Sequence, residues 1–270
     1  MMISSLSNDK VKYVRRLQTD RRFRHREQSF VVEGTRWLTE LLAHPHALRQ
    51  VFYREDWVTT ADRERILAQV NVDRQSVSKE VLRAMSATET APGILAVVTI
   101  DSLPIPPRPT LLIILDAIAD PGNLGTILRA AVATGVDAAL LGPGCVDVYN
   151  PKVVRSGMGA HMRLPVYHLD WSEISTLVEG LYVWLAAGDG PIVYTAVDWR
   201  NPSALIVGNE AHGGGEQARN LATDSIAIPM HAGAESLNAA MAASVILFET
   251  VRQRGLAKNL CYGEIWSNLK

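Results

Sequence analysis

The pattern of apolar and polar positions divides the chain into a front part and a rear part. In the front part, short β-branched runs alternate with segments whose apolar residues recur at helical spacing. The pattern predicts strands at 29–34, 51–53, 70–72 and 94–99, and helices at 9–18, 35–42, 62–69 and 78–85. These elements are typical of a small α/β domain.

The rear part alternates more strictly between strands and helices. It opens with the uninterrupted apolar run 111–116, the pattern of a strand buried on both faces. The pattern predicts further strands at 138–141, 164–168, 181–186, 204–207 and 225–228, and helices at 123–134, 173–178 and 236–254. Such alternation predicts a mainly parallel sheet covered on both faces.

A proline-rich stretch separates the two parts. Residues 101–110 contain four prolines, which oppose both helix and sheet pairing and favour a stiff extended spacer. We therefore predict a front domain at 1–100, a linker at 101–110 and a rear domain at 111–270.

The composition indicates a globular protein whose charges are unevenly distributed along the chain. Of the 270 residues, 47% are hydrophobic and 20% charged, which allows a sizeable core and excludes wholesale disorder. The net charge is −1, but residues 1–110 hold 17 Lys and Arg against 13 Asp and Glu. Within 10–26, eight cations face Asp20 alone. The front domain is therefore the expected contact for a polyanion.

Other features exclude several classes. Two cysteines cannot build a disulfide framework or a four-cysteine metal site, and no metal is expected. The opening residues do not read as a signal peptide, and the apolar run at 111–115 is far shorter than a membrane span of about 20 residues. These observations predict a soluble, cytoplasmic protein without membrane association.

Nucleotide-binding motifs are weak. No P-loop string is present, and the glycine run at 213–215 matches G-x-G-x-x-A only formally, with Ala218 in the last position. The run begins six residues after the predicted strand end at Val207, whereas a Rossmann turn follows its strand directly. A nucleotide-dependent oxidoreductase is therefore only an alternative.

Three segments at predicted strand ends carry unusual polar residues. They are DPGNLGTILRAA at 120–131, LIVGNEAHG at 205–213 and IPMHAGAESLNAAMAASVILFE at 228–249. Taken singly, Asn123 and Ser236 read as helix N-caps, and Glu210 as turn chemistry. Their joint order carries more information than any one of them.

That order closely resembles the SpoU (TrmH-type) branch of the SPOUT RNA methyltransferases across the whole rear domain. The front segment FVVEGTRWLTELL at 30–42 is more loosely similar to the family's substrate-binding domain, which is related in fold to ribosomal protein L30e. The resemblance implies an α/β fold with a SPOUT-type parallel sheet and a deep trefoil knot, plus a small N-terminal L30e-like domain. It also implies a homodimer that transfers a methyl group from S-adenosylmethionine to a ribose 2′-hydroxyl of rRNA or tRNA.

The resemblance also implies roles for individual residues. The expected catalytic set has Arg129 at the reacting hydroxyl, with Asn123, Glu210, Ser236 and Asn238 around it. The expected cofactor-binding set is Ala186, Gly208, Asn209, Ile228, Met230, Ser236 and Leu237. Gly208 is expected to leave room for the ligand, and the apolar members to wall an adenine slot.

Arginines are the expected RNA contacts. Arg155, within NPKVVRSGMGAHMRLPV at 150–166, matches a family arginine that binds substrate phosphate, either in its own subunit or across the dimer interface. Arg21, Arg22 and Arg24 are predicted to contact phosphates from the basic segment. Phe23, Phe30 or Tyr13 are candidates for stacking on an exposed base, with core packing favoured for Phe30.

Two questions stay open from the sequence. Arginine effectively never deprotonates in proteins, so Arg129 is expected to clamp phosphate and stabilise the developing alkoxide, and the proton acceptor is not identified. A non-catalytic RNA- or ribosome-binding protein that retains the fold is the alternative to an enzyme.

Overall fold

The chain forms two compact units, seen in a computed structural model that describes residues 2–209, 212–231 and 236–255. The first unit comprises Met1–Leu103 together with Asp147–Arg163, and the second comprises Pro104–Val146 and Leu164–Lys270. This division differs from the one expected from the sequence, because residues 147–163 group with the front domain.

The first unit is built on a four-stranded sheet. Its strands are β1 (Ser29–Glu33), β2 (Leu48–Tyr53), β3 (Asp73–Ser76) and β4 (Ile94–Thr99), in the order β1-β4-β2-β3. β4 pairs antiparallel with β1 and β2, whereas β2 and β3 are parallel. Its α-helices are α1 (Asp9–Thr19), α2 (Arg21–Glu27), α3 (Thr35–Leu42), α4 (Ala61–Ala68), α5 (Lys79–Met85) and α7 (Pro151–Gly157).

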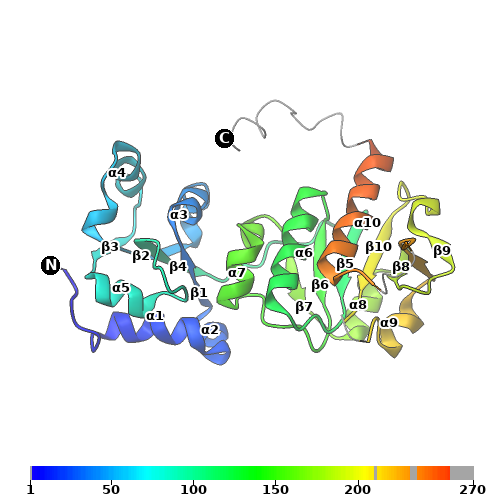
Figure 1. The fold of residues 1–270 in the computed structure, drawn as a ribbon, viewed down its shortest axis with the longest axis horizontal. Coiled ribbons are helices and arrows are strands. Elements are labelled where there is room, and N and C mark those ends of the chain that lie inside the picture. The colour runs from blue at the N-terminus through cyan, green and yellow to red at the C-terminus, as the bar shows by residue number, and fades with distance from the viewer. Residues whose placement is uncertain (1, 210–211, 232–235, 256–270) are drawn as a thin grey trace. The chain divides into compact units, whose positions relative to one another are not determined.

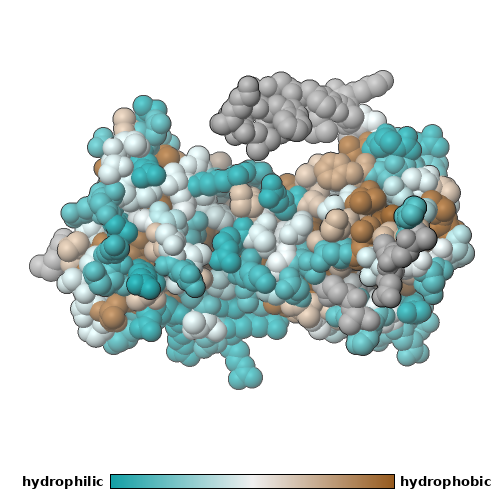
Figure 2. Space-filling model, in the orientation of Figure 1, coloured by the Kyte–Doolittle hydropathy of each residue, from teal (hydrophilic) through white to brown (hydrophobic). Residues whose placement is uncertain are grey.

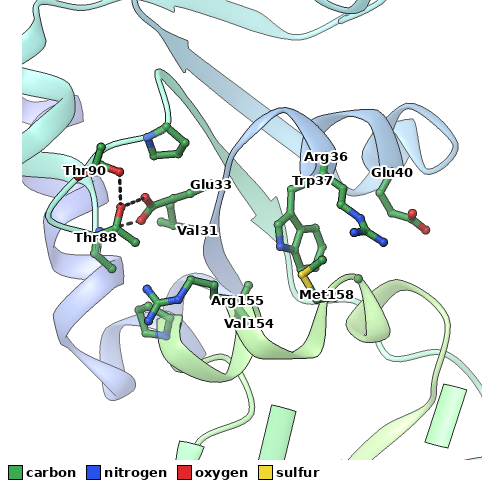
Figure 3. A pocket seen from close by; sticks show the side chains of 14 residues that line it. Val31, Glu33, Arg36, Trp37, Glu40, Thr88, Thr90, Val154, Arg155 and Met158 are labelled. Carbon is green, nitrogen blue, oxygen red and sulfur yellow. Dashed lines mark hydrogen bonds between the residues drawn. The ribbon is translucent and has the colours of Figure 1, made fainter. Parts of the chain in front are cut away.

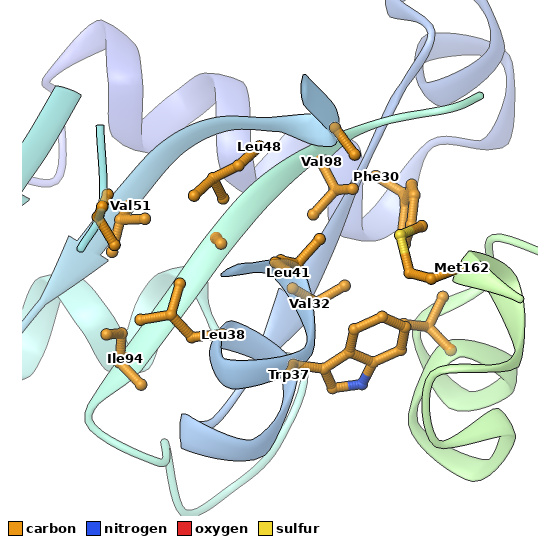
Figure 4. Close-up of a cluster of buried hydrophobic side chains, with 14 of the residues drawn as sticks. Phe30, Val32, Trp37, Leu38, Leu41, Leu48, Val51, Ile94, Val98 and Met162 are labelled. Atoms are coloured by element: carbon orange, nitrogen blue, oxygen red, sulfur yellow. The ribbon is translucent and has the colours of Figure 1, made fainter. Parts of the chain in front are cut away.

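Alternation along the strands produces two apolar clusters in this unit. One face of the sheet packs Phe30 and Val32 against Trp37 and Leu41 of α3, together with Met162 (Figure 4). The opposite face packs other strand residues against α1, α2 and α5. The segment 147–163 therefore completes a core that the front domain starts, which explains why it belongs to this unit.

The second unit is built on a parallel sheet (Figure 1). The strands are β5 (Leu111–Leu115), β6 (Ala138–Leu141), β7 (Val166–His168), β8 (Tyr182–Ala186), β9 (Ile192–Val193), β10 (Ser203–Val207) and β11 (Asp224–Ala227). Their order is β7-β6-β5-β10-β8-β11-β9, and every pairing is parallel. All five residues of β5 and all five of β10 are buried, as expected for central strands covered on both faces.

Helices α6 (Pro121–Ala133) and α10 (Ala239–Arg254) pack against each other. Helices α8 (Trp171–Leu177) and α9 (Glu216–Leu221) contribute to an apolar cluster with residues of β5, β6, β8 and β10. Two predicted N-caps are wrong. Asp120 caps α6 and accepts the amide of Asn123 at 2.8 Å, and Asn238 caps α10 by accepting the amides of Ala240 and Met241. The side chains of Asn123 and Ser236 therefore do not cap these helices.

The strand predicted at 70–72 is also wrong. Val70 and Val72 pack into an apolar cluster from a connecting segment, and the strand follows them as β3. The sequence of β3, DRQS, has no apolar alternation, and its residues are exposed or half-buried. Within the described residues, no helix is long and apolar enough to cross a membrane.

Candidate active site

A cavity of about 220 Å³ opens where the carboxyl ends of β8, β10 and β11 meet the beginning of α10. Its walls contain every residue expected from the sequence to bind the cofactor, namely Ala186, Gly208, Asn209, Ile228, Met230, Ser236 and Leu237. Ligands of parallel α/β sheets bind at the carboxyl ends of the strands, so the cavity lies where the topology favours a site.

Several lining residues were missed from the sequence. They are Ala187, Gly188, Val207, Gly213, Ile226, Ala239, Ala242 and Ile246. Ala239, Ala242 and Ile246 are spaced three and four apart on α10, so a helical projection that continues the Leu237 position could have found them. Ala187 and Gly188 follow β8 directly, and only the strand order brings them beside β10 and β11.

The backbone around position 208 leaves no room for any residue other than glycine. A Cβ atom at this position would lie 2.3 Å from the carbonyl carbon of Gly213 and 2.4 Å from the amide nitrogen of Gly214. The loop after β10 folds back here, with the Gly213 amide donating to the Asn209 carbonyl at 2.8 Å. The expected reason, close approach of a ligand, is therefore incomplete, because the returning loop already forbids a side chain.

Further contacts hold this loop in place. The buried carboxylate of Asp116 accepts the Gly215 amide at 2.7 Å, and Asn209 Nδ2 donates to the Ala117 carbonyl at 2.9 Å. Both contacts join the end of β10 to the end of β5. Ala117 has a φ of 54°, which a non-glycine residue adopts only where the surroundings impose it.

Two asparagines connect the first turn of α6 to the N-cap of α10. Asn238 Nδ2 donates to Asn123 Oδ1 at 2.9 Å. Both sequence neighbours of Asn238, Leu237 and Ala239, line the cavity, so this polar pair lies at its border. The structure thus brings Asn123, Asn238 and Ser236 to one region, as the predicted catalytic set requires.

Arg129 lies apart from that polar pair on α6. It follows Asn123 by six residues, a rise of about 9 Å along a helix, and it does not line the cavity. Its side chain is exposed and has no hydrogen bond or ion pair within the described ranges 2–209, 212–231 and 236–255. A permanently charged guanidinium without a partner is available to an anionic substrate. Glu210, the other member of the predicted set, lies outside the described residues.

The prediction that Arg24 contacts RNA is corrected by its burial. Its side chain is 4% exposed, and its Nε and Nη2 donate to Asp147 Oδ2 at 2.9 and 2.6 Å. Burial opposes ionisation of Asp147, but the hydrogen bonds and charge of Arg24 outweigh it, so the pKa of this carboxyl lies below its ordinary value. Arg24 therefore anchors α2 to the segment 147–163.

The remaining predicted RNA contacts stay accessible. Arg21 and Arg22 are exposed on α2, and Arg155 is exposed on α7 of the first unit. Phe23 and Phe30 are buried, at 6% and 0% exposure, so neither can stack on a base. Tyr13 is half-buried and packs edge-on against Phe23.

Comparison with known proteins gives the same assignment for both units. The SpoU rRNA Methylase family model matches residues 110–248, and the MRM3-like substrate binding domain model matches residues 8–96. An uncharacterized tRNA/rRNA methyltransferase of Synechocystis is 35% identical over 266 residues, covering 94% of this chain and 95% of its own. The 23S rRNA (guanosine(2553)-2′-O)-methyltransferase RlmP of Bacillus subtilis is 32% identical, covering 91% of this chain and 97% of its own.

A solved structure agrees in fold over nearly the whole chain. The SpoU methyltransferase AviRb from Streptomyces viridochromogenes, crystallised in complex with the cofactor AdoMet, has a TM-score of 0.84 and 29% sequence identity, covering 92% of this chain and 98% of its own. These similarities confirm the predicted family, the predicted enzyme class and the predicted cofactor. The chain belongs to the SpoU rRNA methylase family.

Proposed function

We propose that this protein transfers a methyl group from S-adenosylmethionine to a ribose 2′-hydroxyl of ribosomal RNA. The observation that carries the proposal is the cavity at the carboxyl ends of β8, β10 and β11, bordered by the Asn123–Asn238 pair. Ribosomal RNA is favoured over transfer RNA because RlmP and a Streptomyces viridochromogenes relative, 32% identical, are named as 23S rRNA 2′-O-methyltransferases.

The residues of the cavity fit this cofactor. Its walls are largely alanine, glycine and isoleucine, which bring the backbone close to a ligand and offer apolar surface to an adenine ring. The enclosed volume of about 220 Å³ suits one ring system of the molecule. Asn209 and Ser236 supply polar groups at the same walls. When bound, S-adenosylmethionine supplies an electrophilic methyl group.

The chain's own residues then position the hydroxyl and stabilise its charge. Arg129 holds the neighbouring phosphate and stabilises the oxygen as it loses its proton. Asn123, fixed by its bond to Asn238, orients the attacking oxygen from the first turn of α6. Arg129 cannot accept the proton, because an arginine stays protonated in proteins.

The proposal includes the finer features of the fold that the family implies. We expect a deep trefoil knot in the second unit, and a strand order with β8 between the later strands β10 and β11 supports this expectation. We expect the first unit to be the L30e-like substrate-binding domain, and its match to a substrate binding domain model supports that role. The cytoplasmic location stays a prediction.

We also propose a homodimer formed through α10. Its exposed face carries Met241, Val245 and Phe248, which are 58%, 37% and 53% exposed. Figure 2 shows a hydrophobic patch over this helix. The three side chains are spaced four and three apart, so they share one face, and an isologous contact between two such faces would bury all of them.

The experiment that tests the function is methyl transfer from tritiated S-adenosylmethionine to ribosomal RNA under single-turnover conditions. Arg129→Ala should lower the rate by about 10²–10³ with unchanged cofactor affinity, and Arg129→Lys should recover part of it. Arg200→Ala is the matched control, because Arg200 is an exposed arginine of the same unit that pairs with Asp198 at the surface. Parental turnover in Arg129→Ala would remove Arg129 from the site.

A second pair of variants tests the cavity. Ala242→Phe adds a ring at the half-buried wall on α10, so calorimetry should show severe loss of S-adenosylmethionine binding. Gln217→Phe, exposed on α9, adds the same side chain outside the cavity and should bind normally. Equal binding by both variants would place the cofactor elsewhere.

A further inference from the structure

The first unit contains a cavity of its own, of about 290 Å³. It is bounded by α3, the end of β1, the segment 87–92 and α7, all of which belong to that unit. Its lining is mostly apolar, with Trp37, Val31, Val154 and Met158 (Figure 3). It shares no lining residue with the cavity at the ends of β8, β10 and β11, so it needs an explanation of its own.

The acidic groups of the cavity are already satisfied. Glu33 accepts hydrogen bonds from Gln18 Nε2 at 2.9 Å, from the Ala87 amide at 2.7 Å and from the hydroxyls of Ser86 and Thr88. These bonds fix the segment that forms one wall. Glu40 is paired with Arg163 through two hydrogen bonds. Neither carboxylate is paired with an arginine that lines the cavity.

Two arginines of the cavity are left without partners. Arg36 of α3 and Arg155 of α7 are exposed, and neither has a hydrogen bond or ion pair to any residue that the structure describes. Figure 3 shows them reaching the cavity from different helices, with Arg155 toward the Thr88 side and Arg36 beside Glu40. The rim therefore carries two guanidinium groups that form no ion pair with any described carboxylate, around an apolar interior. This combination attracts an anion that also has an apolar part.

Backbone strain occurs at the same place. Met158, which follows α7 as its C-cap, has a φ of 48°, a left-handed conformation that glycine or asparagine adopts more readily. Its side chain lies beside Trp37 in the cavity lining (Figure 3). Non-glycine residues in this conformation persist where the surrounding structure imposes it, and they cluster at ligand-binding and other functional sites. The conformation of Met158 is thus a second, independent indication that this cavity has a function.

We infer that this cavity binds one unpaired nucleobase of the RNA substrate, with Trp37 and Met158 against the base and Arg36 and Arg155 on the adjoining phosphates. The inference rests on the proposed function, because it assumes an RNA substrate. Sequence-specific RNA recognition targets unpaired bases, which can leave the strand and enter apolar pockets lined by aromatic side chains. A paired base cannot enter a pocket of this size, and an apolar peptide would make no use of two free guanidinium groups.

The test measures binding of the full-length protein to a fluorescein-labelled single-stranded RNA hexamer of mixed sequence, by anisotropy at several salt concentrations. Ala87→Leu adds an uncharged side chain at the cavity wall on an exposed residue, so folding is not at risk. It should weaken binding about tenfold, the effect of losing one stacked base, and leave the salt slope unchanged. Met158→Gly should also weaken binding while thermal stability is retained or raised, which excludes unfolding as the cause.

Charge reversal tests the rim. Arg36→Glu should weaken binding and lower the slope of log K against log salt by about 0.7 per lost phosphate contact. Arg65→Glu is the matched control, since Arg65 is exposed on α4 away from the cavity and should change binding little. Duplex RNA of the same length should compete poorly.

The outcomes separate this inference from the proposed function. Unchanged binding by Ala87→Leu and Met158→Gly, or equal competition by duplex RNA, would overturn the nucleobase cavity even if methyl transfer is intact. If an apolar peptide bound the parent protein and Ala87→Leu weakened that binding while RNA binding stayed unchanged, the nucleobase cavity would be overturned in favour of a site for a protein partner. Absence of methyl transfer by the parent protein, with hexamer binding lost in the cavity variants, would instead overturn the proposed function alone.

Discussion

Removing the buried cation Arg24 should destabilise the first unit without removing an RNA contact. In the folded protein both side chains of the Arg24–Asp147 pair are 4% exposed, and Arg24 Nη1 also donates to the Leu17 carbonyl at 2.7 Å. Arg24→Met keeps an unbranched chain of similar length but leaves the carboxylate buried without its cation. Breaking such a pair from one side costs about 3–5 kcal/mol, a large share of the roughly 5–15 kcal/mol that stabilises a typical domain.

The assay combines unfolding with RNA binding. Calorimetry should show the transition of Arg24→Met lowered by on the order of 10 °C. Arg22→Met changes an exposed arginine of the same helix and should alter stability by no more than about 0.5 kcal/mol. The double variant Arg24→Met/Asp147→Leu should recover most of the loss, because it removes both charges together.

The two single variants should differ in the opposite sense in RNA binding: Arg22→Met, the more stable variant, should be the one that loses an RNA contact. Arg22→Met should lower the salt dependence of binding by about one phosphate contact, whereas folded Arg24→Met should keep the parental slope. If Arg24→Met is as stable as Arg22→Met and its salt slope falls, Arg24 is a phosphate contact and the reasoning from its burial is refuted.

Two further predictions concern assembly and pH. Phe248→Glu places a charge in the exposed apolar face of α10, so sedimentation should change from twice the monomer mass to the monomer mass; a parental monomer would contradict the proposed dimer. Burial lowers the pKa of His161, partly offset by its hydrogen bond to the Val148 carbonyl. The unfolded chain therefore takes up a proton below about pH 6.5 while the folded chain stays neutral, and stability should fall from pH 7 to pH 5. His161→Phe should reduce this fall in urea unfolding midpoints, and an unchanged pH dependence would exclude His161 as its source.

The sequence by itself was enough for the features that rest on local pattern. The apolar runs of β5 and β10 predicted buried parallel strands, because such runs leave no polar face for solvent. The motif order predicted the family, and the seven residues that we expect to bind the cofactor do line one cavity. They do so because the carboxyl ends of parallel strands lie at one edge of the sheet, whatever the separation of the strands along the chain.

Only the tertiary structure decided the burial and the contacts of residues whose partners are distant along the chain. In the sequence Arg24 resembles its exposed neighbours in a basic segment, but the carboxylate of Asp147, with which it forms a buried ion pair, lies 123 residues away. Gly208 was expected to be glycine in order to leave room for a ligand, but the backbone of Gly213 already occupies the space that a side chain would need. The segment 147–163 continues the second unit along the chain, yet Val154 and Met162 complete the apolar core of the first. In each case the deciding interaction is non-local, and neither periodicity nor composition within a short window records which distant residue will share a buried environment.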